Sequence, residues 1–373
     1  MMAGMRVALI HDWLTGLRGG EKVLDAICEV FPSADLFTLV HVPGTTSATI
    51  ERRRIVSSPV QWLPGAARRY REYLPLFPFA IEQFDLDGYD LVISTSHCAA
   101  KSVVVPGRAR HLCYCHTPMR YAWDQFNAYF GPERVGALRH RLLRPILAGL
   151  ARWDRDTAGR VHRYLANSQY VARKIAAYYN RESTIVHPPV DTVFYSPDAS
   201  PVRPRFLVVS ALVPYKRVDL AMTAARQAGL ALTVVGDGPE RAHLEELASE
   251  SVELLGRQSD EAIRELYRTS LATVLPGEED FGIVPVEAQA CGRPVVALGR
   301  GGALDSVIPG VTGVLVPDPT VDALAAGLRE AASRHWDSTV IRAHAEQFSR
   351  DRFKHGVAQA ADELMAAPPD RSW

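Results

Sequence analysis

The segment from Pro276 to Ala297 constrains the fold of this 373-residue chain more than any other part of its sequence. It lies between two apolar runs, Leu271–Leu275 and Val295–Leu298, which are typical of buried strands. Inside it, Phe281-Gly282 provides a glycine-bearing turn, and Pro285 suits the first turn of a helix. The order strand, loop, helix, strand is that of a parallel α/β sheet.

Two glutamates flank this glycine-bearing turn. Glu279 falls on the strand-to-helix loop, and Glu287 falls in the first turns of the predicted helix. Between them, the backbone N–H groups of a helix N-terminus are available to phosphate oxygens. Acidic residues are also favoured at helix starts without any ligand. The strands and the turn around these two favour a ligand site, and a nucleotide sugar, with a diphosphate between two polyhydroxylated rings, matches the layout.

Composition and length predict a soluble protein of two domains. Hydrophobic residues make up 47% and charged residues 23% of the chain, and no apolar run approaches the ~18 residues of a membrane span. The first apolar run, Val7–Ile10, is too short for a signal peptide. Five cysteines without a CxxC pair indicate a reducing cytoplasm. Cys113 and Cys115 alternate on a predicted strand, and we interpret them as buried apolar residues rather than metal ligands.

The charge is zero overall but unevenly distributed. Residues 1–190 carry 24 Lys and Arg against 16 Asp and Glu, whereas the remainder carries 18 against 26. Arg52–Arg54, Arg68–Arg71 and Leu138–Arg152 combine cations with apolar residues, as surfaces that dock on anionic membranes do. Solvated charged helices are the alternative interpretation. No nucleic-acid-binding motif is present, so we expect no nucleic-acid partner.

Both halves of the chain alternate short apolar runs with amphipathic helical patterns, which predicts two doubly wound parallel sheets. We expect an N-terminal domain over residues 1–190, a proline-rich linker over 191–204, a second domain over 205–345, and a C-terminal helical segment over 346–373. The predicted strands are Arg6–Ile10, Leu91–Ser94, Ser102–Val105, His111–Cys115, Arg163–Ala166, Thr184–Val186, Arg205–Val209, Leu232–Val235, Val252–Leu255, Ala272–Leu275, Val295–Leu298 and Gly313–Val316.

The pattern E-x-F-G-x-x-x-x-E-A-x-A-x-G-x-P-V-V-A, which starts at Glu279, resembles the signature of the retaining GT4 glycosyltransferases. The resemblance implies the GT-B fold, with two Rossmann-like domains that face each other across a cleft. It also implies that residues 346–373 return to the N-terminal domain. A dinucleotide-dependent oxidoreductase is disfavoured, because G-x-G-x-x-G follows neither first strand.

The resemblance assigns roles in the second domain. Glu287 would accept hydrogen bonds from the ribose hydroxyls, and Glu279 would bind hydroxyls of the donor sugar as a positioning group rather than a nucleophile. Lys216 would stabilise the leaving diphosphate. The family carries an arginine before this lysine, where this chain has Ala211 or Leu212, and Arg217 is a candidate replacement. The remaining expected contacts come from Phe281, Gly282 and Ile283 through their backbone and from Arg257 beside the nucleobase. Gly236 would line the nucleotide cleft, and a purely structural role in a strand–helix turn is the alternative.

In the first domain, Gly19 and Gly20 follow the first strand and open a helix, where they let the backbone approach phosphates or the acceptor. His116 ends a strand in the run H-T-P-x-R-Y-x-W-D, which resembles mannosyltransferases of bacterial surface polysaccharides. The resemblance places it at the acceptor or the transferred sugar. His97, at another strand end, has a functional and a structural interpretation, and both stay open.

Two D-x-D sequences, Asp85-Leu-Asp87 and Asp154-Arg-Asp156, match the metal motif of a different glycosyltransferase architecture. We interpret both as surface charges and expect neither a metal nor a cofactor. The resulting hypothesis is a cytoplasmic, peripheral membrane enzyme that moves mannose from GDP-mannose to a lipid-linked glycan in polysaccharide synthesis. The alternative is a catalytically degenerate GT-B subunit that binds sugar nucleotide or scaffolds a partner transferase.

Overall fold

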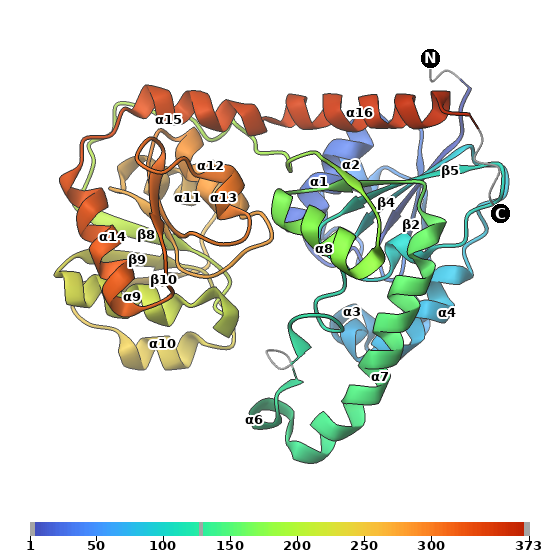
Figure 1. The fold of residues 1–373 in the computed structure, drawn as a ribbon, viewed down its shortest axis with the longest axis horizontal. Coiled ribbons are helices and arrows are strands. Elements are labelled where there is room, and N and C mark those ends of the chain that lie inside the picture. Colours follow the sequence, from blue (N-terminus) through green and yellow to red (C-terminus); the bar gives the residue numbers. More distant parts are fainter. Residues whose placement is uncertain (1–3, 127–129, 369–373) are drawn as a thin grey trace. The chain divides into compact units, whose positions relative to one another are not determined.

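The computed structural model describes residues 4–126 and 130–368. The chain forms two compact units, which we call unit 1 (Met1–Pro189 with Phe353–Trp373) and unit 2 (Val190–Arg352) (Figure 1). Residues 191–204, which the sequence suggests as a linker, belong to unit 2, where Tyr195 is buried. The last helix belongs to unit 1 from Phe353 onward.

Unit 1 contains a seven-stranded sheet in the order β3-β2-β1-β4-β5-β6-β7, and every described strand pair in it is parallel. Its strands are β1 (Val7–His11), β2 (Asp35–Thr38), β3 (Ile55–Ser57), β4 (Leu91–Ser96), β5 (Arg110–Cys115), β6 (Arg163–Ala166) and β7 (Ser183–Ile185). Its helices are α1 (Gly19–Val30), α2 (Ala48–Glu51), α3 (Ala66–Arg69), α4 (Phe77–Glu82), α6 (Pro132–Val135), α7 (Ala137–Asp156), α8 (Gln169–Tyr179) and α16 (Arg350–Ala366).

Helix α16 completes one of the apolar cores of unit 1. Its buried residues, among them Phe353, Val357 and Leu364, share a cluster with residues of β1, β4 and α1. The ring of Phe353 packs against Tyr114 of β5, with centroids 5.4 Å apart. A segment from the far end of the sequence is therefore part of the first unit's interior (Figure 1).

Unit 2 contains a six-stranded parallel sheet in the order β10-β9-β8-β11-β12-β13. Its strands are β8 (Arg205–Val209), β9 (Ala231–Val235), β10 (Val252–Gly256), β11 (Thr273–Leu275), β12 (Val295–Leu298) and β13 (Gly313–Val316). Its helices are α9 (Val218–Ala228), α10 (Arg241–Leu247), α11 (Asp260–Thr269), α12 (Ile283–Ala290), α13 (Ala303–Ser306), α14 (Val321–Ser333) and α15 (Ser338–Ala345).

Two parallel α/β units confirm the predicted fold class, and the differences are local. The strand predicted at Ser102–Val105 is wrong, because residues Ala100–Ser102 form a short 3-10 helix. The cause is Asp12, whose carboxylate accepts the backbone N–H groups of residues 97 to 100 and so holds them in a turn. The short strands β2 and β3 were not predicted.

Each sheet has one point where the strand order reverses, between β1 and β4 in unit 1 and between β8 and β11 in unit 2. In doubly wound sheets, ligands bind beyond the carboxyl ends of the strands at this point. We therefore expect the ligand-binding residues in the four loops that follow β1, β4, β8 and β11. None of the helices within residues 4–126 and 130–368 combines the length and apolar character that a membrane-crossing segment needs.

Candidate functional site

In unit 2 the predicted lysine and glutamate meet at the reversal point. Lys216 ends the 3-10 helix Pro214–Lys216 after β8, and Glu279 lies in the loop after β11. The Nζ atom of Lys216 donates a hydrogen bond to Oε1 of Glu279. An ammonium and a carboxylate from two different loops are therefore in contact where the fold class binds its ligands.

Close backbone packing fixes the loop that carries Glu279. A Cβ added to Gly277 would lie 2.6 Å from the carbonyl oxygen of Tyr215, and one added to Gly302 would lie 2.2 Å from Cα of Phe281. The N–H group of Gly302 also donates to the carbonyl oxygen of Glu279 at 2.8 Å. The Gly301-Gly302 turn after β12 is thus part of the site. Sequence reasoning missed it, although a glycine pair after a buried strand is the signal that identified Gly19 and Gly20.

Glu287 lies on α12, one turn beyond its start. Its Oε2 atom accepts a hydrogen bond of 3.0 Å from the hydroxyl of Tyr267, a fully buried residue of α11 that the sequence analysis did not single out. Burial, followed by the charge of Glu287, raises the pKa of Tyr267 well above its ordinary value. The tyrosine therefore stays protonated and orients the carboxylate by donating to it.

At the start of α12, the predicted ligand contacts would come from backbone groups rather than from side chains. Gly282 precedes the helix with φ at 84°, a conformation that favours glycine, and Ile283 is its first residue. The ring of Phe281 is buried against Phe348, with centroids 5.7 Å apart. Because its ring is part of the core, Phe281 can contribute to a ligand site only through its backbone.

The other predicted residues of unit 2 lie at the same edge of its sheet. Gly236 follows β9, and its N–H group donates to Gly256 at the end of β10, directly before the exposed Arg257. Arg217 has φ at 53° and contacts Asp219, with Nε 3.2 Å from Oδ1. The structure thus brings Lys216 to Glu279, whereas the described contacts of Arg217 are with Asp219 of α9.

In unit 1 the predicted glycines and histidines converge beyond the carboxyl ends of β1, β4 and β5. Gly19 and Gly20 begin α1, and a Cβ on Gly20 would lie 3.7 Å from Cε1 of His11 and 3.8 Å from Nε2 of His116. The rings of His97 and His116 have centroids 6.0 Å apart. Helix α1 therefore starts directly against the histidines.

Asp12 and His11 form the base of this cluster, and sequence reasoning did not assign either as a site residue. Asp12 is fully buried, accepts four backbone N–H groups at 2.6 to 3.0 Å, and lies 3.1 Å from Nδ1 of His97. Burial raises the pKa of Asp12. Burial is also the main cause that lowers the pKa of His11 and of His97 to about 3. Both imidazoles are therefore neutral at physiological pH. The signal in the sequence that could have identified them is the polar pair His11-Asp12 at the end of an apolar strand.

One of the four D-x-D aspartates departs from its predicted position. Asp154 is fully buried, with Oδ1 3.0 Å from Nζ of Lys101, and Oδ2 accepts hydrogen bonds from Trp123 and Tyr179. The interpretation of Asp154 as a surface charge is wrong, because a buried ammonium from a distant loop compensates its charge. The other three, Asp85, Asp87 and Asp156, are exposed as predicted.

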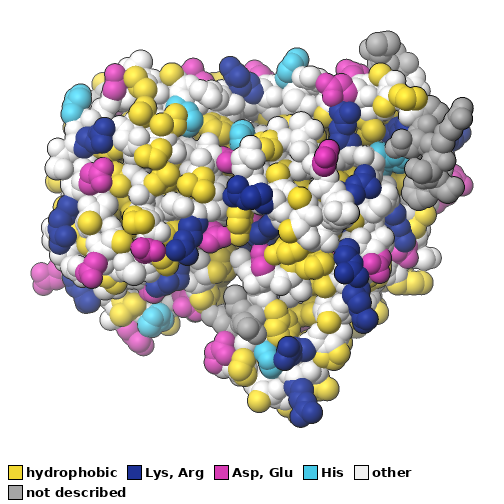
Figure 2. All heavy atoms as spheres, in the orientation of Figure 1, with side chains coloured by type: hydrophobic (Ala, Val, Ile, Leu, Met, Phe, Trp, Pro, Cys, Tyr) yellow, Lys and Arg dark blue, Asp and Glu magenta, His cyan; other side chains and the backbone are white. Residues whose placement is uncertain are grey.

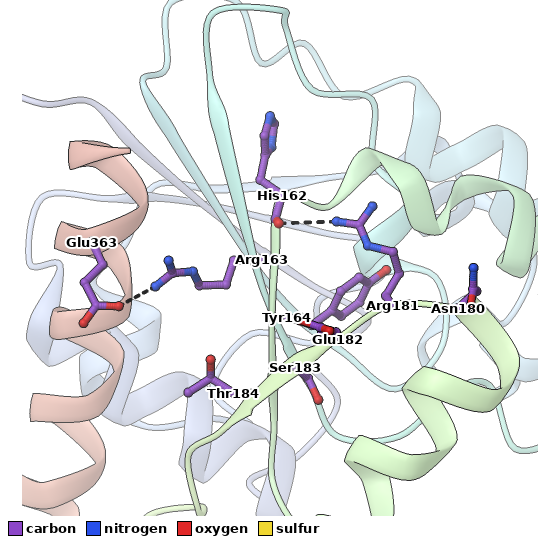
Figure 3. Close-up of a pocket in the computed structure, with 9 residues that line it drawn as sticks. All are labelled: His162, Arg163, Tyr164, Asn180, Arg181, Glu182, Ser183, Thr184 and Glu363. Carbon is purple, nitrogen blue, oxygen red and sulfur yellow. Dashed lines mark hydrogen bonds and ion pairs between the residues drawn. The ribbon is translucent and has the colours of Figure 1, made fainter. Parts of the chain in front are cut away.

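In unit 1, a polar hollow of about 530 Å³ lies by the amino-terminal ends of β6 and β7, at the edge of the sheet opposite to the histidines (Figure 3). Its two arginines are bound by the protein itself. Nη1 of Arg163 lies 2.6 Å from Oε2 of Glu363 on α16, and Arg181 donates to the carbonyl oxygen of Val161 at 2.7 Å. We therefore interpret this hollow as part of the attachment of α16, and the carboxyl edge as the functional edge.

Two family models match nearly the whole chain. The model for glycosyl transferases group 1 matches residues 196–347, and that for Glycosyltransferase Family 4 matches residues 17–194. The chain belongs to the GT4 glycosyltransferases, and its two units are the Rossmann-like units of the GT-B fold.

The curated relatives include D-inositol 3-phosphate glycosyltransferases. The one from Salinispora arenicola is 32% identical over 57% of this chain and 57% of its own length, and that from Mycolicibacterium smegmatis is 28% identical over 57% and 54%. The chain thus matches little more than half of their length. Among solved structures, HepE of Anabaena in complex with UDP has a TM-score of 0.71 at 19% identity, covering 96% of this chain and 100% of that one. Sucrose-phosphate synthase of Thermosynechococcus elongatus has 0.69 at 18%, covering 98% and 100%.

Proposed function

We propose that this protein is a retaining glycosyltransferase that moves a hexose, mannose from GDP-mannose, to a lipid-linked glycan in the synthesis of a surface polysaccharide. The observation that carries the proposal is the contact between Lys216 and Glu279 at the reversal point of the unit 2 sheet, in front of the start of α12. A cation and free helix N–H groups at this edge are what a departing diphosphate requires.

The geometry of unit 2 supports the following proposed roles. Lys216 neutralises the charge that builds on the diphosphate, and the N–H groups at the start of α12 bind its oxygens. Glu279 orients the donor sugar through its hydroxyls. Glu287, itself oriented by Tyr267, binds the ribose. The reaction proceeds on one face of the sugar, with the departing phosphate oxygen taking the proton of the acceptor hydroxyl. No metal ion is needed in this scheme.

In unit 1 we propose that His116, with His97 beside it, binds the acceptor. The pairing of Gly20 with His116 places a helix start and an imidazole side by side, so one end of the acceptor meets backbone donors and the other a side chain. The neutral state of His97 suits contact with a hydroxyl, which a neutral imidazole both donates to and accepts from.

Helix α7 supports the proposal that the protein works on the inner face of the cytoplasmic membrane. Leu138, Leu142 and Ile146 repeat every four residues and are 73%, 59% and 42% exposed. Arg139 and Arg141 flank this row, and the sequence from Ala137 to Trp153 contains no acidic residue. Figure 2 shows apolar and basic side chains intermingled over the part that Figure 1 labels α6 and α7. Such a face fits an anionic lipid surface.

The test of the proposed function is turnover by the purified full chain. Nucleotide release is followed for GDP-mannose and for UDP-sugars, because HepE was solved with UDP. A bacterial lipid extract serves as one acceptor and D-inositol 3-phosphate, after which the relatives are named, as another. We expect release with GDP-mannose and lipid extract, with retained anomeric configuration in the product. Glu287→Gln is expected to raise the Kd for the nucleotide.

A degenerate subunit is the second candidate, and one observation favours it. The loop position where the family carries an arginine is occupied by Ala211, which is exposed, or by Leu212, which is buried, and Arg217 contacts Asp219. Nucleotide binding without turnover of any donor, in the presence of both acceptors, would support the subunit and contradict the enzyme.

A further inference from the structure

Three arginines from three segments of unit 1 lie close enough to His97 for their charges to act on it. Arg18 immediately precedes α1, Arg71 lies in the 3-10 helix Tyr70–Leu76, and Arg120 lies in the loop after β5. After burial, the charges of Arg120, Arg71 and Arg18 are the largest causes that lower the pKa of His97. The three guanidinium groups thus act on one imidazole at the carboxyl edge of the sheet.

Ring contacts place Arg71 beside the histidine cluster, and its position in the chain places Arg18 there. The guanidinium of Arg71 lies 6.0 Å from the ring centroid of Trp13 and 5.2 Å from that of Tyr70. The ring of Trp13 in turn meets His97 edge-on, with centroids 4.4 Å apart. Arg18 directly precedes Gly19 and Gly20, and Gly20 lies against His116. The cations therefore border the same space as the predicted acceptor residues.

Two acidic groups of this region, Asp12 and Glu21, are held below the surface. Asp12 is fully buried and bound by four backbone N–H groups and by His97. Glu21 is 3% exposed and accepts the backbone N–H group of Arg18 at 3.0 Å. Arg18 and Arg71 are exposed, and Arg120 is half-buried. The three arginines therefore present positive charge beside the histidines, and Glu72, the exposed acid that follows Arg71, lies 3.9 Å from Arg69.

We propose that Arg18, Arg71 and Arg120 bind a phosphate or diphosphate group of the acceptor, and that the acceptor of this enzyme is for this reason a phosphorylated molecule. The inference rests on the proposed function and adds the chemical class of the second substrate. Guanidinium groups bind phosphate oxygens in a bidentate way. The phosphate of the acceptor would contact the three arginines, and its attacking hydroxyl would contact the neutral imidazoles. A phosphorylated soluble polyol and a diphosphate-linked lipid share this chemistry.

The test is binding to the full chain, measured by calorimetry with the nucleotide site saturated by GDP. D-Inositol 3-phosphate and inorganic phosphate are the anionic probes, and myo-inositol is the neutral one. We expect the phosphorylated polyol to bind at least about 10-fold more tightly than myo-inositol. Arg71→Gln and Arg18→Gln are each expected to weaken phosphate binding about 10-fold, because a hydrogen bond to a charged group is lost. The control Arg108→Gln removes an exposed arginine before β5, at the other edge of the sheet, and should change nothing.

One experiment distinguishes the two sources of phosphate and also distinguishes this inference from the proposed function. Vesicles that carry a polyprenyl diphosphate glycolipid, compared with a neutral glycolipid, report the lipid source, and the soluble pair reports the free source. In transfer assays the arginine variants should raise KM for the acceptor and leave GDP binding unchanged. Equal affinity for charged and neutral probes, or variants that behave like Arg108→Gln, would overturn the inference. Loss of GDP binding or turnover in the unaltered chain would instead contradict the proposed function.

Discussion

At the scale of single residues, the site of unit 2 depends on how one lysine is held. Lys216 and Glu279 are both partly buried and contact each other, so each fixes the position of the other before any ligand is bound. A donor diphosphate offers the ammonium a second anionic partner. Preorganised charge of this kind acts most strongly where the reaction develops charge.

The first prediction concerns this lysine. Lys216→Met should lower kcat for sugar transfer by about 100- to 1000-fold, because the leaving diphosphate loses its cation. Glu279→Gln in the same chain should add less than its single effect, since the two residues act as a unit. Steady-state kinetics measure both. The matched control is Lys354→Met, which breaks a lysine–glutamate contact of 3.2 Å with Glu29 in unit 1; a similar loss there would contradict the prediction.

The second prediction concerns the dependence of stability on pH. His111 is fully buried, lies 2.8 Å from Ser94 Oγ and 3.1 Å from the carbonyl oxygen of Arg160, and burial lowers its pKa to about 3. In the unfolded chain His111 has a pKa near 6.5 and is protonated below that pH, whereas in the folded chain it stays neutral down to about pH 3. Stability is therefore complete above pH 6.5 and falls as the pH drops towards 3, by up to about 1.4 kcal/mol per pH unit.

The variant His111→Gln tests this slope. Urea unfolding between pH 7 and pH 4 should show a shallower loss of the free energy of unfolding in the variant than in the unaltered chain. His11 and His97 contribute in the same direction, because their pKa values are lowered as well, while the raised pKa of Asp12 opposes them. Identical slopes in both proteins would show that His111 takes up its proton in the folded state.

At the scale of elements, local sequence patterns predicted most of the fold. They did not predict features that depend on contacts between segments far apart in the sequence. Mainly apolar runs of four or five residues located β5, β6 and β12 to within a residue, because a buried parallel strand has no polar face. Strand β3 has only three residues, and two of the four residues of β2, Asp35 and Thr38, are polar, so neither strand carries such a run. Likewise, the order of strands and turns led to Lys216 and Glu279. The burial of Asp154 depends on Lys101, a partner that no local pattern specifies.

The third prediction concerns the loop after β12. Gly302→Ala should destabilise unit 2 by about 1–3 kcal/mol, because a Cβ there would meet the backbone of Phe281 and Asp280 at 2.2 to 2.6 Å. The loop with Glu279 must then shift, and the Kd for the nucleotide should rise. Thermal unfolding and calorimetry measure the two effects. Gly159→Ala, where a Cβ meets nothing within 4 Å, is the control and should leave both unchanged.

The fourth prediction concerns helix α7. Replacement of Leu138 and Leu142 by serine should reduce binding to vesicles of phosphatidylglycerol by at least about 10-fold, because two apolar side chains no longer enter the lipid. Vesicle flotation measures this. Val193→Ser, which changes a comparably exposed residue of unit 2, is the control. Unchanged flotation of the α7 variant would remove this helix from the membrane proposal.

At the scale of the whole molecule, each unit has its own cores, and α16 contributes to one of those of unit 1. The fifth prediction follows from this division. Phe353→Ala should cost unit 1 about 3–5 kcal/mol, whereas Phe348→Ala, five residues earlier, should cost unit 2 a similar amount. Hydrogen exchange of peptides from β5 and β11 distinguishes the two. Loss of protection in both units for either variant would contradict the division.

The return of α16 also sets an order of events during synthesis. Residues 190–352 form one uninterrupted stretch, so unit 2 holds everything it needs once that stretch has left the ribosome. Unit 1, although most of it precedes unit 2, cannot close its interior until residues 353–366 have followed unit 2 out of the ribosome. Unit 1 therefore begins before unit 2 in the sequence and is completed after it, so the apolar residues that pack against α16 stay uncovered while unit 2 is made.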